Sequence, residues 1–259
     1  MTHMLSKTNL LLAVPPTEMM AAQGFGLTLA HMAYRVGGGP HLFRANLPVP
    51  VRGGVMLIDD AGFDGRGDPA PFCQEVVREC AARGYTGVIC DFDRHLPLLG
   101  QVIAGLSPLL AKRGWPLYVP EPYGRYSATA KVLIPTALSG GSLQVRLQEA
   151  VQQYGAARVA LAVERSAEDF FLPSPNGQGI RLTQEELQQR IQEREPVIFF
   201  SNELCAHYFT YMAGRQGHFV LFDDAGSVKK KLQIGRELGI PTAFLPYGEM
   251  ADILGAVLA

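Results

Sequence analysis

The sequence predicts an α/β protein whose core is a parallel sheet, folded as one domain. From Gly53 onward, short apolar runs alternate with amphipathic stretches in units of roughly 30 residues, which is typical of repeated strand–helix units. The runs are apolar throughout rather than at every second residue, as in parallel strands covered on both faces. The 259 residues also match the size, about 250 residues, of a single barrel of alternating strands and helices. No linker interrupts the series, so we expect a single domain over residues 1–259.

The first 52 residues fit this alternation less well. Two extended segments, residues 25–36 and 41–51, flank the turn Gly37-Gly38-Gly39-Pro40, which predicts either a hairpin or the first two barrel strands. The earlier apolar run at residues 9–14 ends at Pro15-Pro16 and is too short for a convincing signal peptide. The sequence therefore gives no support for secretion.

The later elements follow in order. Eight apolar runs are the strand candidates: residues 54–58, 87–90, 116–119, 131–134, 158–163, 197–200, 218–222 and 242–245. Five helix candidates lie between them: residues 71–83, 98–112, 143–154, 185–193 and 228–238. A glycine follows most of the helices, as expected at a helix C-terminus. Thr183 and Glu186 form a capping-box pattern, and Ser227 is the expected cap of the last helix.

Composition and charge exclude several classes of protein. The balance of 23 Lys and Arg against 24 Asp and Glu gives a net charge of −1, without the basic excess of a nucleic-acid binder. An apolar content of 47% excludes a disordered chain. No apolar run approaches the ~18–20 residues that span a bilayer. We expect neither a nucleic-acid partner nor a membrane span, and the sequence identifies no protein partner.

The cysteines and histidines do not form a metal-binding pattern. The four cysteines, Cys73, Cys80, Cys90 and Cys205, include no CxxC pair, and the six histidines include no HExxH motif. We expect reduced thiols in the core, no metal and no cofactor.

Acidic residues follow most of the predicted strands. They are Asp59, Asp60, Asp91, Asp93, Glu121, Glu164, Glu203, Asp223, Asp224 and Glu249. In a barrel, the C-terminal strand ends form the active face, so these carboxylates would converge. A ring of acids with Tyr and Phe between them suits sugar binding and glycoside chemistry. An acid after a strand also commonly caps the next helix or turn, and for any one of them that is the simpler explanation. Asp91 and Asp93 differ, because alternate residues on a strand point to the same side.

Several segments resemble glycoside hydrolase family 18. The stretch Gly84-Tyr85-Thr86-Gly87-Val88-Ile89-Cys90-Asp91-Phe92-Asp93 is similar to the fourth-strand signature DxxDxDxE. Further segments follow in family order: residues 158–163, 169–173, 182–186, 222–231 and 239–248. The resemblance covers about residues 53–250. Because it includes spore-associated members, it implies a spore or cell-wall context as the alternative to the cytoplasm. It implies a TIM (β/α)8-type barrel with a small antiparallel insertion, residues 165–225, before the last strand. Residues 197–200 and 219–222 would then form an antiparallel pair in that insertion.

The resemblance also implies the site and its defects. In the family, the final Glu of the signature protonates the glycosidic oxygen, and the preceding Asp orients the N-acetyl group of the substrate. Asp91 matches that Asp, whereas Asp93 replaces the Glu, and Thr86 and Ile89 replace the earlier acids. Shortening the acid by one carbon misplaces the carboxyl, and a misplacement near 1 Å can cost on the order of 10²-fold in rate.

Two more family residues are missing. The sixth-strand Tyr, which hydrogen-bonds the N-acetyl group, is absent from Pro135-Thr136-Ala137-Leu138. The eighth-strand Trp that floors the sugar subsite falls at Leu245 or Pro246. A degenerate catalytic motif and crippled hydrolysis are therefore expected.

The candidate site follows from the acids, the aromatic residues and the resemblance. Asp93 and Asp91 are the catalytic candidates. The substrate-binding candidates are Asp60, Glu121, Tyr123, Glu164, Asp169, Tyr247 and Glu249.

Three hypotheses of function remain. The first is a catalytically impaired barrel that binds a glycan containing N-acetylglucosamine, of chitin or peptidoglycan type, or serves as an interaction module. The second is an active glycosidase with Asp93 as general acid and a second strand-end carboxylate. The third, an unrelated barrel enzyme such as an isomerase or aldolase, is disfavoured because no Gly-rich phosphate loop follows the late strands.

Overall fold

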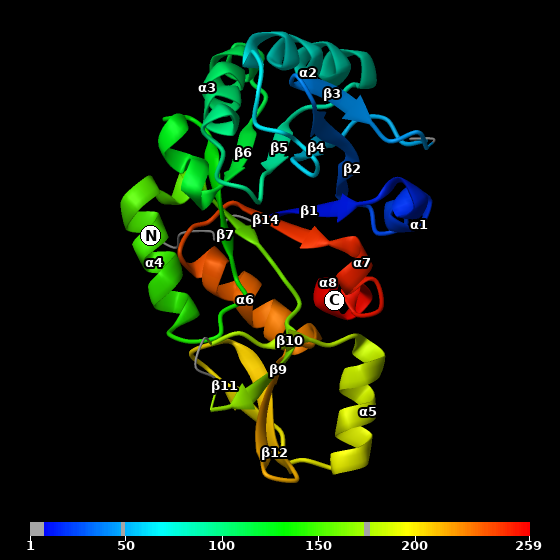
Figure 1. The fold of residues 1–259 in the computed structure, drawn as a ribbon, viewed down its shortest axis with the longest axis vertical. Coiled ribbons are helices and arrows are strands. Elements are labelled where there is room, and N and C mark those ends of the chain that lie inside the picture. Colours follow the sequence, from blue (N-terminus) through cyan, green and yellow to red (C-terminus); the bar gives the residue numbers. More distant parts are fainter. Residues whose placement is uncertain (1–7, 48–49, 174–176) are drawn as a thin grey trace.

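A computed structural model describes residues 8–47, 50–173 and 177–259. Its main body is a closed barrel of eight parallel strands (Figure 1). The strands, in sheet order, are β1 (Asn9–Val14), β14 (Thr242–Pro246), β8 (Val159–Ala162), β7 (Lys131–Pro135), β6 (Leu117–Pro120), β5 (Val88–Asp91), β4 (Val55–Asp59) and β2 (Thr28–Gly37). The barrel closes because β1 pairs in parallel with both β14 and β2. The TIM-type α/β barrel expected from the resemblance is confirmed.

The N-terminal segment supplies two of the barrel strands. β1 is the apolar run at residues 9–14, which the sequence analysis considered only as a possible signal peptide. The first strand of the barrel was therefore not predicted. β2 and β3 (His41–Arg44) form an antiparallel hairpin, and β2 is also the second barrel strand. The two alternatives for this segment were each correct in part, while β3 lies outside the barrel ring. Residues 48–49, part of the expected second segment, lie outside the described residues.

The described residues contain the five expected helices in the expected order, as α2 to α6, together with three short helices that the sequence did not predict, α1, α7 and α8. They are α1 (Met19–Gln23), α2 (Pro69–Arg83), α3 (Pro97–Ala111), α4 (Leu143–Tyr154), α5 (Gln184–Arg194), α6 (Ala225–Glu237), α7 (Tyr247–Met250) and α8 (Leu254–Leu258). Three short 3-10 helices, η1 (Pro16–Glu18), η2 (Glu121–Tyr126) and η3 (Ala156–Arg158), complete the set. Among the described residues, no helix is long and apolar enough to cross a membrane.

The helix caps explain where the helices begin and end. α2 ends at Gly84, whose φ of 74° is in the left-handed region that glycine adopts without strain. Thr183 and Glu186 form the expected capping box of α5. The expected cap of α6 was wrong: Asp224 is the N-cap, and Ser227 is its capping-box partner three residues on. A carboxylate and a hydroxyl can both take the cap position, so the pattern alone places the start of the helix only to within a turn.

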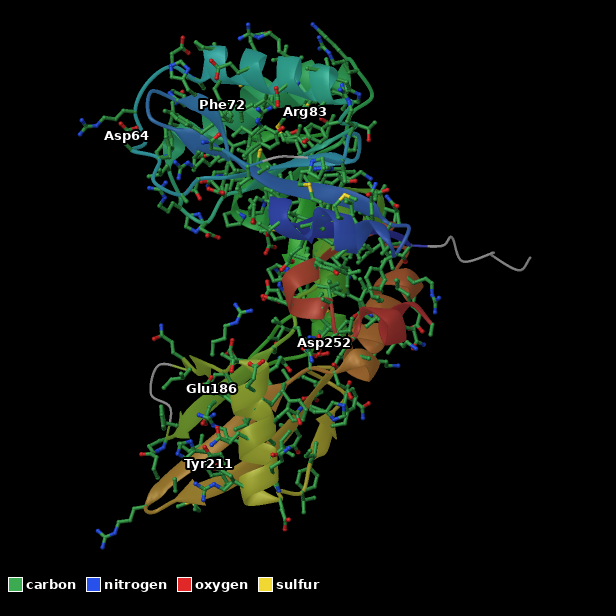
Figure 2. The ribbon with its side chains drawn as sticks, turned by 90° about the vertical axis from the view of Figure 1, so that its right-hand side faces the viewer. Asp64, Phe72, Arg83, Glu186, Tyr211 and Asp252 are labelled. Atoms are coloured by element: carbon green, nitrogen blue, oxygen red, sulfur yellow. The ribbon has the colours of Figure 1, made fainter. Side chains whose placement is uncertain are left out.

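The chain segment between β8 and α6 contains a second sheet, which is antiparallel. This sheet lies in the lower lobe of the molecule in Figures 1 and 2. Its order is β10 (Ile180–Arg181), β9 (Ala167–Leu172), β13 (Gln216–Phe222), β12 (Ala206–Ala213) and β11 (Phe199–Ser201). This is the small antiparallel insertion before the last barrel strand. The expected direct pairing of residues 197–200 with 219–222 was wrong, because β12 lies between β11 and β13 and pairs with both.

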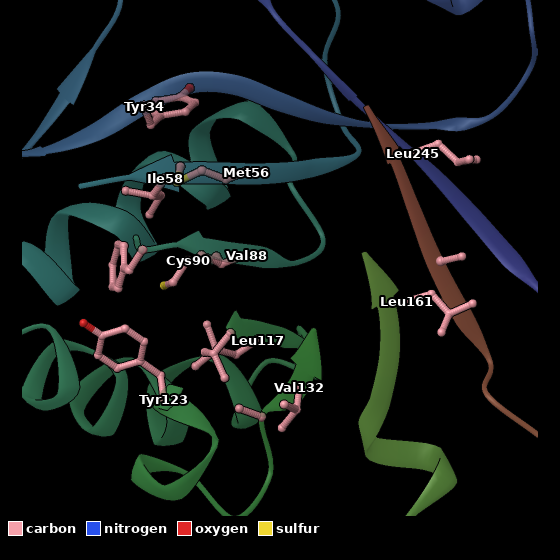
Figure 3. Packing of buried hydrophobic residues seen from close by; sticks show 14 of the residues in the cluster. Tyr34, Met56, Ile58, Val88, Cys90, Leu117, Tyr123, Val132, Leu161 and Leu245 are labelled. Carbon is pink, nitrogen blue, oxygen red and sulfur yellow. The ribbon is translucent and has the colours of Figure 1, made fainter. Parts of the chain in front are cut away.

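Two layers of apolar side chains form the barrel core. On β4, Val55 and Leu57 belong to the cluster inside the barrel, whereas Met56 and Ile58 pack outward under the helices. Figure 3 shows the outer layer, in which Cys90 lies close to the Val88 side chain. All four cysteines are buried free thiols, in agreement with the expectation of reduced core residues.

Candidate functional site at the mouth of the barrel

The C-terminal ends of the barrel strands form a mouth that contains carboxylates. Leu57 and Ile89 lie in the inner cluster of the barrel. Asp59 and Asp91, two positions further along the same strands, therefore lie on the inward side. The two aspartates are also partners in the register between β4 and β5. The strand alternation thus places neighbouring acids at one edge of the mouth.

A cavity of about 170 Å³ opens at this mouth. On β8 the inward alternation runs through Ala160 and Ala162 to Glu164, directly after the strand. Asp91 and Glu164 are the two acidic residues of the cavity, and the rest of its lining is apolar. The lining residues are Ala13, Leu57, Ile89, Asp91, Leu133, Ala162, Val163, Glu164, Phe244 and Pro246. The structure therefore brings two of the sequence candidates to one opening with an apolar floor.

The Asp91 carboxyl has a perturbed acidity. Its pKa is raised from 3.8 to about 6, first because the surrounding protein removes part of its hydration, and then because Asp93, Asp59 and Asp60 add negative charge. The side chain is still open to solvent at the mouth. Near pH 6 the group can therefore either donate or accept a hydrogen bond to a ligand.

Glu164 connects this cavity with a second one. The second cavity, about 280 Å³, lies between the barrel and the insertion and includes Glu164, Glu249, Arg165 and Arg181. The pKa of Glu164 is raised, mainly by burial and then by the nearby Glu249 charge. Glu249 lies on α7, where its carboxylate pairs with Arg181 and accepts a hydrogen bond from the backbone N–H of Arg165 at 3.4 Å. Glu164 and Glu249 therefore share one cavity beside the mouth.

Asp60 and Asp93 occupy different environments. Asp60 is buried, and its carboxylate accepts hydrogen bonds from the backbone N–H groups of Asp93 (3.1 Å) and Arg94 (3.3 Å) and from Arg94 Nε (3.1 Å). It holds the loop after β5 in place, and both of its oxygens are used there. Asp93 is exposed on that loop and does not line the mouth cavity. Its charge still acts on Asp91.

Glu121 and Tyr123 lie on η2, and Tyr123 contacts the loop after β5. Glu121 pairs with Arg146 of α4. The Tyr123 side chain is only 2% exposed, and its ring packs edge-on against Phe92 with the ring centroids 5.8 Å apart. Its hydroxyl accepts a hydrogen bond from the Leu96 N–H and donates one to the Arg94 carbonyl. The buried ring supports the loop and presents no face to a sugar.

The two remaining candidates are also buried. Tyr247 packs edge-on against Phe25, with the ring centroids 6.1 Å apart. Asp169 lies inside the insertion, where it accepts hydrogen bonds from His218 Nδ1 at 2.9 Å and from the Tyr211 hydroxyl at 3.0 Å. Arg190 of α5 adds an ion pair to the same carboxylate. The acid of the 169–173 segment therefore stabilises the insertion, away from the barrel mouth.

The structure also places the positions at which the resemblance predicts that family residues are missing. Pro246 lines the mouth cavity, whereas Leu245 is fully buried in the outer layer. Ile89 lies on the cavity floor. Thr136 is buried, with its hydroxyl 3.4 Å from the Glu164 N–H, and Ala137 lines the second cavity. Apolar or small side chains therefore occupy these positions around the two cavities.

Sequence reasoning missed Phe244 and Arg165. Phe244 was treated as an ordinary strand residue, yet its ring forms part of the mouth floor and packs edge-on against Tyr118, centroids 4.8 Å apart. The inward alternation along β14 could have found it. Arg165 was not considered, although it follows Glu164 directly. Its guanidinium donates hydrogen bonds to the Glu249 carbonyl at 2.9 Å and to the Asp252 carboxylate at 2.6 Å. In the described part of the chain, no group of three His, Cys, Asp or Glu residues is placed to hold a metal ion.

Solved structures share this architecture. The chitinase from Chromobacterium violaceum matches with a TM-score of 0.71 at 17% identity, over 97% of this chain and 98% of that one. The spore cortex-lytic enzyme SleL from Bacillus megaterium matches with a TM-score of 0.69 at 16% identity, over 94% and 71% of the two chains. A mutant family 18 chitinase from Cycas revoluta, solved in complex with (GlcNAc)4, matches with a TM-score of 0.62 at 13% identity, over 96% and 98%.

No family model matches this sequence, and no curated protein matches it either. The structural matches are below the identity at which function transfers, and they establish the fold. The matches extend along nearly the whole chain, 97% of it for the Chromobacterium violaceum chitinase and 96% for the Cycas revoluta chitinase. The protein has a glycoside hydrolase family 18-like fold.

Proposed function

We propose that the protein binds a glycan containing N-acetylglucosamine at the mouth of the barrel and hydrolyses it weakly or not at all. The observation that supports this best is that Asp91 and Glu164 both line one cavity whose other lining residues are apolar. Carboxylates accept hydrogen bonds from sugar hydroxyls, and the ring C–H groups of a sugar pack on apolar surface. Phe244 and Pro246 supply that surface here.

The ligand class follows from the structural matches. One of them was solved with (GlcNAc)4, and others are chitinases or spore cortex-lytic enzymes. We therefore place a chitin-type or peptidoglycan-type glycan first among the ligands to be tested. Of the sequence candidates, Asp91, Glu164 and Glu249 are the ones we propose as ligand contacts, with Asp93 at the rim.

Weak hydrolysis is proposed from the acids themselves. Asp93, at the position of the family's proton donor, is exposed beyond the cavity and one carbon shorter than Glu. A positioned general acid contributes typically 10²–10⁴-fold in rate. The raised pKa of Asp91 leaves it partly protonated near pH 6, but the residues that line the cavity include no tyrosine that could support an acetamido group.

The test is calorimetric titration with (GlcNAc)4, run with product analysis on the same samples. The wild-type protein should bind and release little or no product. Asp91→Asn and Glu164→Gln should each weaken binding by about 10–100-fold, the value of a hydrogen bond to a charged group. Glu149→Gln, an exposed carboxylate on α4, is the matched control and should bind like the wild type. Absence of binding in the wild type, or equal binding in all four proteins, would refute this proposal.

A second candidate is an active glycosidase in which Asp93 is the acid. Its support is that the Asp93 charge reaches Asp91 and contributes to its raised pKa. In that case Asp93→Asn should abolish turnover of the oligosaccharide, whereas in the impaired protein it changes nothing measurable. Asp93→Glu distinguishes the two further: restored reach should raise product release by about 10²-fold if only the shorter acid limits the rate.

A further inference from the structure

The hairpin of β2 and β3 has an outer face that is bonded to the helix beside it. On this face, Tyr34 donates a hydrogen bond to Glu79 of α2 at 2.9 Å, and Arg44 pairs with the same carboxylate at 3.3 Å. Glu75 of α2 accepts a hydrogen bond from the Leu42 N–H at 2.7 Å. These contacts hold the hairpin against α2, so the position of its inner face is fixed as well (Figure 1).

The inner face of the hairpin continues the wall of the barrel. Met32 is in register with Leu57, which belongs to the cluster inside the barrel, and Arg35 is in register with Asp59. A β-bulge between Met32 and Tyr34 brings both Met32 and Arg35 to this inward side, although they are three residues apart. Met32 (42% exposed) and Arg35 are exposed, whereas the residues between them are buried. The bulge therefore turns two side chains of β2 toward the mouth.

Phe43 of β3 completes this inner face. It lies opposite Arg35 in the register of the hairpin, with the guanidinium carbon 5.9 Å from the ring centroid. The ring is 48% exposed and lies over Gly37, where a Cβ atom would collide with it. Within the described part of the chain, no hydrogen bond or ion pair occupies the Arg35 guanidinium. An apolar ring beside available N–H donors suits the two aspects of a sugar, its apolar face and its oxygen-bearing edge.

A cavity of about 440 Å³, here called the hairpin cavity, lies on this face and adjoins the barrel mouth. Met32, Arg35 and Phe43 line it together with Asp59. Asp59 is the register partner of Asp91, which lines the mouth cavity, and the charge of Asp59 acts on Asp91. In the sheet, β2 lies two strands from β5, which is roughly 10 Å. Neighbouring rings of one oligosaccharide span such a distance, so one ligand can reach both cavities.

We propose that the hairpin cavity is a second sugar subsite, in which a further ring of the glycan packs on Phe43 and Met32 while Arg35 donates hydrogen bonds to its oxygens. This inference rests on the proposed function, because it assigns a second position to the same ligand. A free anion is a poorer occupant, since Asp59 lines the same cavity and would repel it. The hairpin lies in the upper part of Figure 1 and the insertion in the lower part. A glycan held by the hairpin would therefore extend from the mouth away from the insertion.

Calorimetric titration with (GlcNAc)4 tests this subsite. Phe43→Ala and Arg35→Gln should each weaken binding by about tenfold, through the loss of apolar contact and of a charged donor respectively. Met212→Ala and Arg215→Gln, exposed positions on the insertion that line neither cavity, are the matched controls and should bind like the wild type. If both hairpin variants bind like the wild type while Asp91→Asn binds weakly, the subsite is refuted and the proposed function stands. Absence of binding in the wild type refutes both.

Phe43→Trp gives a second readout, which a loss of structure would not produce. This variant keeps an aromatic face, so it should bind (GlcNAc)4 about as tightly as the wild type. Its indole emission should shift to shorter wavelength when a sugar ring covers the side chain. The single native tryptophan, Trp115, precedes β6 at the opposite end of the barrel strands and should not respond. Met212→Trp, the matched control, should bind without any shift. Binding by Phe43→Trp with unchanged emission would overturn the assignment of this subsite.

Discussion

At the scale of single residues, the negative charge of Asp91 at the barrel mouth lowers the stability of the folded protein at neutral pH. The pKa of Asp91 is about 6 in the folded protein against an ordinary 3.8, so the folded state holds its proton more tightly than the unfolded chain. Its contribution to stability is therefore complete below about pH 3.8 and is lost as the pH rises through 6. Functional sites often retain such unfavourable charges.

Asp91→Asn should therefore be more stable than the wild type at pH 7–8, with a difference that shrinks as the pH falls toward 4. Thermal melts of both proteins across pH 4–8 measure this. A melting-temperature difference that is independent of pH would show that Asp91 titrates normally and would weaken the case for a partly desolvated site.

His31 shows the opposite sign. This fully buried side chain on β2 has its pKa lowered from 6.5 to about 4, mainly by burial, with the Arg83 charge acting in the same direction. The neutral ring is favoured in the folded state, so the stabilisation is present above about pH 6.5 and is lost as the pH falls through 4. A difference of this size corresponds to about 3 kcal/mol.

We expect the free energy of unfolding to fall by an amount of this order between pH 6.5 and 4 in the wild type. In His31→Leu this loss should be smaller. Denaturant titrations of both proteins at the two pH values give the comparison, and an identical pH dependence would assign the acid sensitivity to other groups.

At the scale of elements, α6 joins the insertion to the barrel through a buried charge pair. Lys231 Nζ lies 2.6 Å from Asp223 Oδ2, and both side chains are almost fully buried. Asp223 also accepts hydrogen bonds from the Ser227 hydroxyl (2.7 Å) and from the Ser166 N–H (2.8 Å) at the start of the insertion. Ser227 and Lys231 lie four residues apart on one face of α6, and Asp223 lies directly before the N-cap of that helix. The pair thus connects both chain crossings between the two lobes.

Removing one partner should leave an uncompensated buried charge. Lys231→Met is expected to lower the free energy of unfolding by about 3–5 kcal/mol. Lys229→Met, exposed on the same helix, should have little effect. The double variant Asp223→Asn with Lys231→Met should recover part of the loss, as measured by denaturant titration; a single variant as stable as its control would show that the pair is dispensable.

At the scale of the whole molecule, the cavity at the barrel mouth adjoins the second cavity, which lies between the barrel and the insertion. The barrel mouth and the second cavity share Glu164 and Pro246, and the second cavity is completed by Glu168 and Arg181 of the insertion. Asp252, labelled in Figure 2, lies where the C-terminal segment comes close to the insertion and pairs with Arg165. A ligand bound at the mouth would therefore contact a surface that no single strand–helix unit contains.

The amino-acid sequence by itself determined the alternation of strands and helices, because apolar runs and glycine stops are local properties. It also predicted that Asp91 and Asp93 share one side of a strand, since a strand alternates with a period of two. This was wrong for Asp93, because β5 ends at Asp91 and Asp93 lies on the following loop, outside the cavity lining. The sequence could not show that residues 9–14 close the barrel. That role depends on pairing with β14, more than 200 residues away in the chain.

Only the tertiary structure decided which acids reach the mouth. Asp60, Glu164 and Asp169 all follow or begin strands and look alike in the sequence, yet Asp60 binds loop amides, Asp169 pairs with His218 and Arg190, and Glu164 lines the cavity. A carboxylate is placed by the partners that compensate its burial. Those partners come from distant segments, and packing alone brings them together.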